Sequence, residues 1–256
     1  MEKGKIRKTN KRLAITKMIL VVILVVSVTY IFLHFYNSNK NKNLYDGMSS
    51  IVEKSTETGE LDKSVMVEQV KELQKENADV KGWIKIDGTD ISYPLLQSSD
   101  NDYYVSRNYK KEKSKYGSIF IAYNSDLKNE NSHVMIYGHD MKDGQMFAGL
   151  VNYIDKSFYD EHPTIRIATD EKEELYQIIY VFKSRRFNED ETEVFRYYRY
   201  YEFNAQREIE EYINNCKKEQ LYDTETNITS NQIITLTTCE YSQKDGRLVV
   251  VAQKVN

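Results

Sequence analysis

The chain of 256 residues is long enough for one or two domains, and its hydrophobic content of 40% can support a buried core. The formal net charge of −3 is unevenly distributed: residues 1–17 carry a net charge of about +6, with Glu2 as their only acidic residue, so the rest of the chain carries about −9. An acidic bulk argues against nucleic acid as a partner, because phosphate binding needs a basic surface.

The first predicted element is a membrane-spanning helix at residues 18–36, "MILVVILVVSVTYIFLHFY". Its residues 18–35 hold no charge and would extend over about 27 Å as a helix, enough to cross the hydrocarbon core of a bilayer. A cleaved signal peptide is the alternative, but its apolar part is usually shorter and ends at a small-x-small cleavage site. We therefore expect an uncleaved signal-anchor, with a cytoplasmic basic tail at 1–17 and residues 37–256 outside the cell membrane.

The rest of the chain predicts a mainly β domain with flanking helices. Residues 37–60 are polar and predict an extracytoplasmic stalk, and apolar residues at helical spacing predict an amphipathic helix within 61–77. Short segments rich in β-branched and aromatic residues predict eight strands, which favour a mostly antiparallel closed or half-closed barrel. These strands are expected at 83–86, 91–97, 118–123, 133–138, 164–169, 174–182, 232–239 and 247–255.

Two helical segments are expected between the strands, a short one at 146–154 and a longer one at 204–222. The longer segment carries Cys216 on an apolar stripe with Ile209, Tyr212 and Ile213, where a cysteine usually acts as a small core residue.

The other cysteine, Cys239, ends the predicted strand "QIITLTTC", and Arg247 opens the next strand after the turn "EYSQKDG". If these strands are neighbours, the two side chains lie at the same end of the sheet. The guanidinium would then lower the thiol pKa or hold an oxyanion formed when the sulfur attacks a carbonyl. The alternatives are a solvated strand-end arginine and an extracytoplasmic disulfide between Cys216 and Cys239.

A cysteine nucleophile needs a proton-accepting partner, and the chain has four histidines. His34 lies at the membrane edge, His162 precedes Pro163 in a predicted turn, and His133 lies in polar "NENSH" before a strand. His139 follows the strand "VMIYG", where a scaffold delivers a reactive side chain into a groove, so it is the candidate base.

Other kinds of site are disfavoured by spacing. Neither cysteine lies in a C-x-x-C pair or near a histidine, so no zinc site is expected, and the acidic stretch "SSDNDYY" lacks the spacing of a calcium loop. We expect no metal and no cofactor. The tyrosine-rich run "YYRYYEF" at 197–203 is consistent with a peptide groove or with half-buried packing.

The chain resembles the sortases, and most closely the class B sortases. The resemblance rests on "TLTTC" at 235–239 followed by Arg247, and on "YGHDM" at 137–141. Supporting stretches are "GWIKIDGTDISYPLLQSSDNDYY" at 82–104, "YGSIFIAYNSD" at 116–126 and the long helix before the cysteine strand. The likeness covers about residues 61–256 and implies a catalytic domain built on the eight-stranded sortase barrel.

The resemblance implies a cysteine transpeptidase with Cys239 as nucleophile, His139 as general acid/base and Arg247 as oxyanion or substrate-orienting group. By the same resemblance Asn101, Val105, Tyr137, Thr237 and Glu240 fall where the family binds substrate. The implied partners are a sorting-signal peptide of the N-P-x-T-x type, a cell-wall precursor amine and the membrane. Pairing Cys239 in a disulfide would abolish its nucleophilicity, so the resemblance disfavours the bridge.

Two rival functions stay open at this point. A non-catalytic, membrane-anchored domain that binds peptides would be insensitive to loss of the Cys239 thiol. A hydrolytic cysteine peptidase would release its product to water even when an amine is supplied.

Overall fold

The computed structural model describes residues 2–57, 64–129, 133–201, 203, 206–229 and 232–255. The chain divides into two compact units, Met1–Asp46 and Gly47–Asn256.

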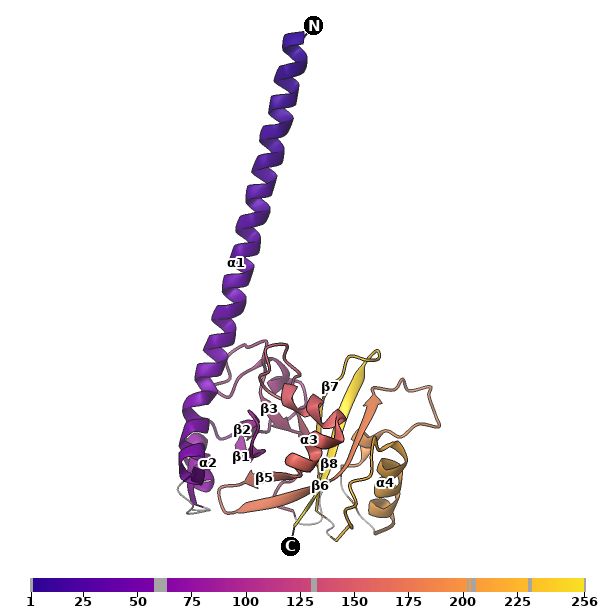
Figure 1. Cartoon of the computed structure of the whole chain (residues 1–256). Helices are drawn as coiled ribbons and strands as arrows, with labels where there is room; N and C mark the ends of the chain where they lie inside the picture. The colour runs from indigo at the N-terminus through magenta and orange to yellow at the C-terminus, as the bar shows by residue number, and fades with distance from the viewer. Residues whose placement is uncertain are drawn as a thin grey trace. The chain divides into compact units, whose positions relative to one another are not determined.

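Helix α1, Glu2–Glu57, contains the predicted anchor (Figure 1). By length and composition its stretch Leu13–Ser49 is able to cross a membrane. Apolar side chains such as Leu20, Val26 and Phe32 are more than half exposed there, which is unfavourable in water and suits a lipid environment. The predicted stalk is helical as far as Glu57, and residues 58–60 lie outside the described part of the chain.

The second unit is built on a closed barrel of eight strands in the order β1-β2-β3-β4-β7-β8-β6-β5. All eight predicted strands are present, with ends that shift by a few residues. Their bounds are β1 Val80–Lys85, β2 Ser92–Leu96, β3 Ile119–Ile121, β4 His133–Tyr137, β5 Thr164–Ala168, β6 Glu173–Arg185, β7 Ile233–Cys239 and β8 Gly246–Lys254.

Most strand pairs are antiparallel, as predicted, but β2–β3 and β4–β7 are parallel. A parallel pair needs a long connection, and the chain between β4 and β7 supplies one that includes β5, β6 and several helices. Parallel pairing puts the C-terminal ends of β4 and β7 at the same end of the barrel. This arrangement determines where the residues after β4 lie.

One face of β7 points into the barrel and the other points outward, because strand side chains alternate. Ile234 and Leu236 on the inner face are fully buried. Helix α2, Ser64–Glu76, packs against β1 and β5 with Met66, Val70 and Leu73 buried, which confirms the amphipathic helix within its described residues.

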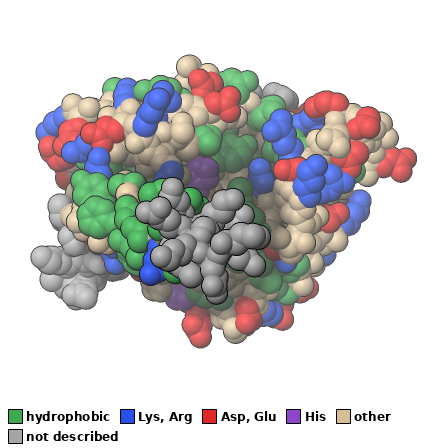
Figure 2. All heavy atoms as spheres, turned by 90° about the horizontal axis from the view of Figure 1, so that it is seen from above, with side chains coloured by type: hydrophobic (Ala, Val, Ile, Leu, Met, Phe, Trp, Pro, Cys, Tyr) green, Lys and Arg blue, Asp and Glu red, His purple; other side chains and the backbone are tan. Residues whose placement is uncertain are grey.

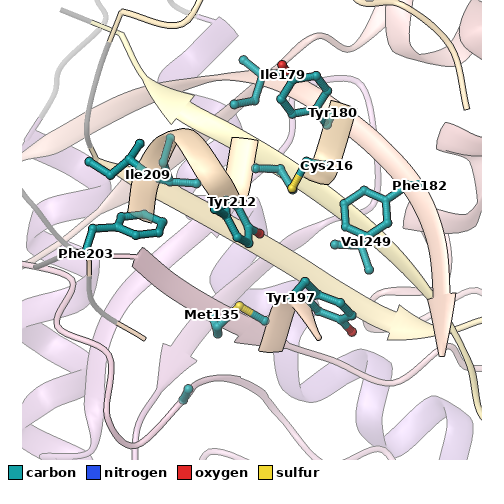
Figure 3. Packing of buried hydrophobic residues seen from close by; sticks show 13 residues of the cluster. Met135, Ile179, Tyr180, Phe182, Tyr197, Phe203, Ile209, Tyr212, Cys216 and Val249 are labelled. Carbon is teal, nitrogen blue, oxygen red and sulfur yellow. The ribbon is translucent and has the colours of Figure 1, made fainter. Parts of the chain in front are cut away.

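A second hydrophobic cluster covers the outer face of β4, β7 and β8. Helix α4, Gln206–Glu219, supplies Ile209, Tyr212 and Cys216, which are buried against Met135 of β4 and Val249 of β8 (Figure 3). Cys216 is a free, fully buried thiol, as its place on the apolar stripe predicted. Helix α4 is therefore packed on the outer face of the sheet as part of a hydrophobic core.

The remaining helices lie in connections. The helix predicted at 146–154 is a 3-10 helix, η2, at Ala148–Ile154, because Met146 has a left-handed backbone (φ 61°) and pairs as a β-bridge with Asp140. Helix α3, Lys156–Glu161, was not predicted; the Asp155 side chain caps it by accepting from the Ser157 N–H. Two further 3-10 turns are η1, Tyr103–Ser106, and η3, Tyr197–Arg199.

Candidate active site

The parallel pair β4–β7 brings His139 beside Cys239. Tyr137 at the end of β4 is the register partner of Thr237 on β7. One residue further on, the Gly138 N–H donates to the Thr237 carbonyl (3.2 Å), and the Thr238 hydroxyl donates to the Gly138 carbonyl (2.9 Å). The backbone on either side of Gly138 is thus fixed to β7, so the next residue, His139, is delivered to the strand end that carries Cys239.

The antiparallel pair β7–β8 brings Arg247 to the same place. Cys239 and Arg247 are direct register partners, as their positions on either side of one turn predicted. The Arg247 guanidinium donates through Nη1 to the carbonyls of Gly246 (2.8 Å) and Asp245 (3.3 Å), which restrains it at the strand end. Cys239 is a free, partly exposed cysteine, so the disulfide with the buried Cys216 is absent from the molecule.

The three side chains open into one cavity of about 460 Å³, a volume suited to a short peptide segment. Figure 2 shows hydrophobic, basic and histidine side chains around a recess in this face, and side chains of these kinds line the cavity together with polar ones. The lining residues are Asn101, Val105, Phe120, Tyr137, Gly138, His139, Arg186, Tyr197, Tyr198, Tyr201, Thr237, Thr238, Cys239 and Arg247.

The backbone of Val105 orients the imidazole. His139 Nε2 lies 2.8 Å from the Val105 carbonyl oxygen, and a carbonyl can only accept, so Nε2 carries a proton. The turn beneath this carbonyl depends on Gly117, which has a left-handed φ of 58°; a Cβ there would lie 2.6 Å from the Val105 oxygen. With Nε2 protonated, Nδ1 is the acceptor nitrogen of the neutral ring.

Four of the five residues predicted to bind substrate line the cavity: Asn101, Val105, Tyr137 and Thr237. Asn101 Oδ1 accepts from the Tyr123 N–H (2.9 Å), which leaves its amide NH₂ as a donor. Tyr137 stacks on Phe120 with ring centroids 5.3 Å apart, and burial raises the pKa of its hydroxyl.

Thr237 is tied into the wall of the cavity. Its hydroxyl lies 2.9 Å from the hydroxyl of Tyr197, and burial raises the pKa of Tyr197 to about 12, so both groups are neutral. The Thr237 hydroxyl therefore already has a protein partner.

Glu240 does not line the cavity. It is buried and hydrogen-bonds with Lys183 Nζ (3.1 Å) and the Ser242 hydroxyl (2.6 Å). Burial raises the pKa of the Glu240 carboxyl, but the hydrogen bonds from Ser242 and Lys183 outweigh it and hold the pKa below its ordinary value. The carboxylate thus links Ser242, in the turn between β7 and β8, to Lys183 on β6.

Several lining residues were not singled out from the sequence. Tyr197, Tyr198 and Tyr201 belong to the tyrosine-rich run whose composition is consistent with a groove, and the structure brings all three to the cavity. Phe120 and Arg186 carried no signal, since each lies next to ordinary strand residues. Among the described residues, no group of three or more His, Cys, Asp or Glu side chains is arranged to hold a metal ion.

Known proteins are similar to this chain in sequence and in architecture. The sortase domain family model matches residues 84–255. Sortase B of Listeria monocytogenes is 35% identical over 218 residues, which cover 84% of this chain and 85% of the relative. A Staphylococcus aureus sortase B–substrate complex superposes with a TM-score of 0.73 at 27% identity, covering 86% of this chain and 99% of that one. Sortase B from Bacillus anthracis gives 0.71 at 33% identity, covering 87% and 99%.

Proposed function

The chain belongs to the sortase family of cysteine transpeptidases, and we propose that it works as a class B sortase on sorting-signal peptides. In this proposal the enzyme cleaves an N-P-x-T-x type signal after its threonine and transfers the protein to an amine of a cell-wall precursor. The observation that supports it most is the opening of Cys239, His139 and Arg247 into one cavity at the ends of three adjacent strands.

Cys239 is the proposed nucleophile. Its thiolate attacks the main-chain carbonyl carbon of the threonine residue in the signal, and a tetrahedral oxyanion forms. Arg247 is the register partner of Cys239, so its guanidinium is within reach of the developing negative charge. The sulfur–carbon bond forms as the carbonyl double bond opens, and the charge moves to oxygen.

His139 is the proposed proton carrier. With Nε2–H bonded to the Val105 carbonyl, Nδ1 takes the thiol proton and gives it to the departing amine. The peptide C–N bond breaks, the amine leaves neutral, and an acyl thioester remains on Cys239. Because the carbonyl accepts from Nε2–H in both charge states, the ring keeps its orientation through both proton transfers.

The second half of the reaction reverses these roles. An acceptor amine attacks the thioester carbonyl, loses a proton to Nδ1, and expels the sulfur, which regains its proton. The products are a new amide and the free thiol, so no oxidant or other co-reactant is needed.

We further propose that α1 anchors the enzyme in the cell membrane with residues 1–17 in the cytoplasm. The support is the apolar stretch within Leu13–Ser49 and the excess of Lys and Arg before it. The catalytic unit would then lie outside the cell, where sorting signals and wall precursors meet.

Product analysis tests the proposal. The full-length chain in detergent micelles is incubated with an N-P-x-T-x peptide, with and without a small amine acceptor such as triglycine, and the products are identified by mass spectrometry. We expect a new peptide joined to the acceptor after threonine. Cleavage that yields only the free acid in the presence of the amine would favour the hydrolytic peptidase, and an intact peptide would favour the non-catalytic domain.

A further inference from the structure

A second histidine, His133, lies at the other end of β4 and has no part in the proposed reaction. Its side chain is completely buried, and both ring nitrogens have partners. Nδ1 lies 2.5 Å from the Tyr200 carbonyl oxygen, and Nε2 lies 2.8 Å from the Thr235 hydroxyl. The Tyr212 hydroxyl lies 2.8 Å from the same Thr235 oxygen. These groups connect β4, β7, α4 and the segment before α4.

The chemistry of the partners fixes the direction of each hydrogen bond. The Tyr200 carbonyl can only accept, so Nδ1 carries the proton and Nε2 of the neutral ring accepts from the Thr235 hydroxyl. The Thr235 oxygen then accepts from the Tyr212 hydroxyl. Burial lowers the pKa of His133 to about 4, which keeps the ring in this neutral form at physiological pH.

Of the residues joined by these hydrogen bonds, Tyr200 is the one that lies nearest to the proposed function. It lies in a segment, residues 195–201, that carries Tyr197, Tyr198 and Tyr201 on the wall of the active-site cavity. We call this segment the tyrosine wall. His133 holds its main chain directly, through a carbonyl between two cavity-lining side chains.

Aromatic packing holds the same segment to α4. The Tyr212 ring lies 5.2 Å from the Tyr200 ring and 5.7 Å from the Phe195 ring, and His133 stacks on Phe203 at 5.3 Å. Figure 3 shows the rings of Tyr212, Phe203 and Tyr197 gathered between α4 and the outer face of the sheet. Packing alone allows a ring to slide, whereas the directed hydrogen bonds fix the height of the main chain above the sheet.

We propose that His133, together with Thr235 and Tyr212, is a positioning residue that fixes the tyrosine wall for recognition of the sorting-signal peptide. The inference rests on the proposed function, because it assigns the wall to the binding of that peptide. No other side chain can replace the imidazole simply: one planar ring donates to Tyr200 on one side and accepts from Thr235 on the other.

The decisive variant is Thr235→Val, which keeps the shape of the side chain and removes the central hydroxyl. Its matched control is Thr224→Val, since Thr224 is also buried and its hydroxyl donates to the Ile179 carbonyl (2.7 Å), with no hydrogen bond to the tyrosine wall among the described residues. Tyr212→Phe is a milder second variant that removes only the outer donor, should Thr235→Val fold poorly.

Each variant is made in a Cys239→Ala background, so that peptide affinity is measured without turnover. A fluorescent N-P-x-T-x peptide is titrated into the full-length chain in micelles. We expect about tenfold weaker binding for Thr235→Val, about threefold weaker binding for Tyr212→Phe, and a change of less than twofold for Thr224→Val. Amide hydrogen exchange over residues 195–201 should be faster in the first two variants only.

Equal affinities in the Thr235→Val and Thr224→Val variants would overturn the inference, as would faster exchange in the tyrosine wall without weaker binding. Unchanged exchange over residues 195–201 would refute the anchoring itself, whatever the enzyme does with peptide. Failure of the proposed function is a separate result, because it shows in the parent chain as the absence of any acyl adduct on Cys239.

Discussion

The two ends of β4 carry the same kind of side chain in opposite roles. At one end His133 is buried with Thr235 and Tyr212 under α4, and the cysteine of that region, Cys216, is buried as well. At the other end the sheet face is open, and the side chains of His139 and Cys239 line a cavity together with Arg247. All of these groups lie over one outward face of β4, β7 and β8. The covered end and the open end differ in access to water and substrate, not in residue type.

This contrast explains why one thiol is a candidate nucleophile and the other is inert. Burial raises the pKa of Cys216 well above its ordinary value, so it stays a protonated core side chain. Cys239 has a register partner with a fixed positive charge and a neighbouring imidazole.

Removing each thiol in turn should give the widest separation. Cys239→Ala should lower kcat/KM for the sorting-signal peptide by about 10⁴-fold or more, because no thioester can form. Cys216→Ala should leave kcat/KM within about threefold and cost about 1 kcal/mol of unfolding free energy through a small cavity. Steady-state kinetics and thermal unfolding measure both; equal loss of activity in the two variants would refute the assignment.

Removing the charge at the open end comes next. Arg247→Ala should lower kcat by about 10²–10³-fold, since the oxyanion loses its counter-charge, while the alkylation of Cys239 by a small neutral reagent persists. Arg186 lines the same cavity without being a register partner of Cys239, so Arg186→Ala is the matched control and should change kcat less than tenfold. A larger effect on kcat at Arg186 than at Arg247 would mean that Arg186, and not Arg247, stabilises the oxyanion.

The position of His139 depends on the lack of a side chain at Gly138. A Cβ there would lie 2.5 Å from Ile119 Cδ1 and 2.7 Å from the Phe147 ring, so either the strand end or these buried side chains must move. Gly138→Ala should lower kcat by about 10–100-fold. Gly149→Ala is the control, because its Cβ would meet Ile91 at an ordinary 3.4 Å, and kcat should stay within about twofold. Full activity in Gly138→Ala would show that the imidazole does not need this placement.

The buried His133 should make the folding stability of the chain fall at acidic pH. The pKa of His133 is about 4 in the folded chain against an ordinary 6.5, so the unfolded chain binds the extra proton between these values. Stability from the neutral ring is therefore complete above about pH 6.5 and falls as pH drops towards 4, by about 3 kcal/mol in total. Tyr212 and Cys216 do not titrate in this window, because burial raises both pKa values.

Chemical denaturation at several pH values checks this slope. Between pH 7 and 4, the free energy of unfolding should fall by about 3 kcal/mol less in the His133→Gln variant than in the parent chain. Thr224→Val, which lowers stability without removing a titrating group, should keep the slope of the parent. A slope that is the same in His133→Gln and in the parent would mean that the ring binds its proton over the same pH range in the folded and the unfolded chain.

The strand pattern and the cysteine end of the site could be predicted because they are local. Each strand shows in its own run of β-branched and aromatic residues, and Cys239 meets Arg247 across a single turn. His139 was predicted from its place after a strand and a glycine and from the sortase resemblance. The parallel pairing that brings it to Cys239 joins segments about a hundred residues apart, and no local pattern encodes that.

The covered end was hidden for the same reason. His133 follows a polar stretch at the start of a predicted strand, which gives no sign of burial, yet α4 and the tyrosine wall bury it completely. Its partners, Thr235 and the Tyr200 carbonyl, lie far along the chain, so the burial arises from tertiary packing alone. Glu240 was predicted to bind substrate from the sortase resemblance, and the structure directs its carboxylate to Lys183 on β6 instead of the cavity.

Mapping the acyl adduct tests the division between the two ends most directly. The full-length chain in micelles is mixed with an N-P-x-T-x peptide, quenched in acid within seconds, digested and analysed by mass spectrometry. This division between the two ends predicts an acyl mass on the peptide that contains Cys239, an unmodified Cys216, and loss of the adduct in His139→Ala. An adduct on Cys216, or none on Cys239 while the sorting signal is still cleaved, would contradict it.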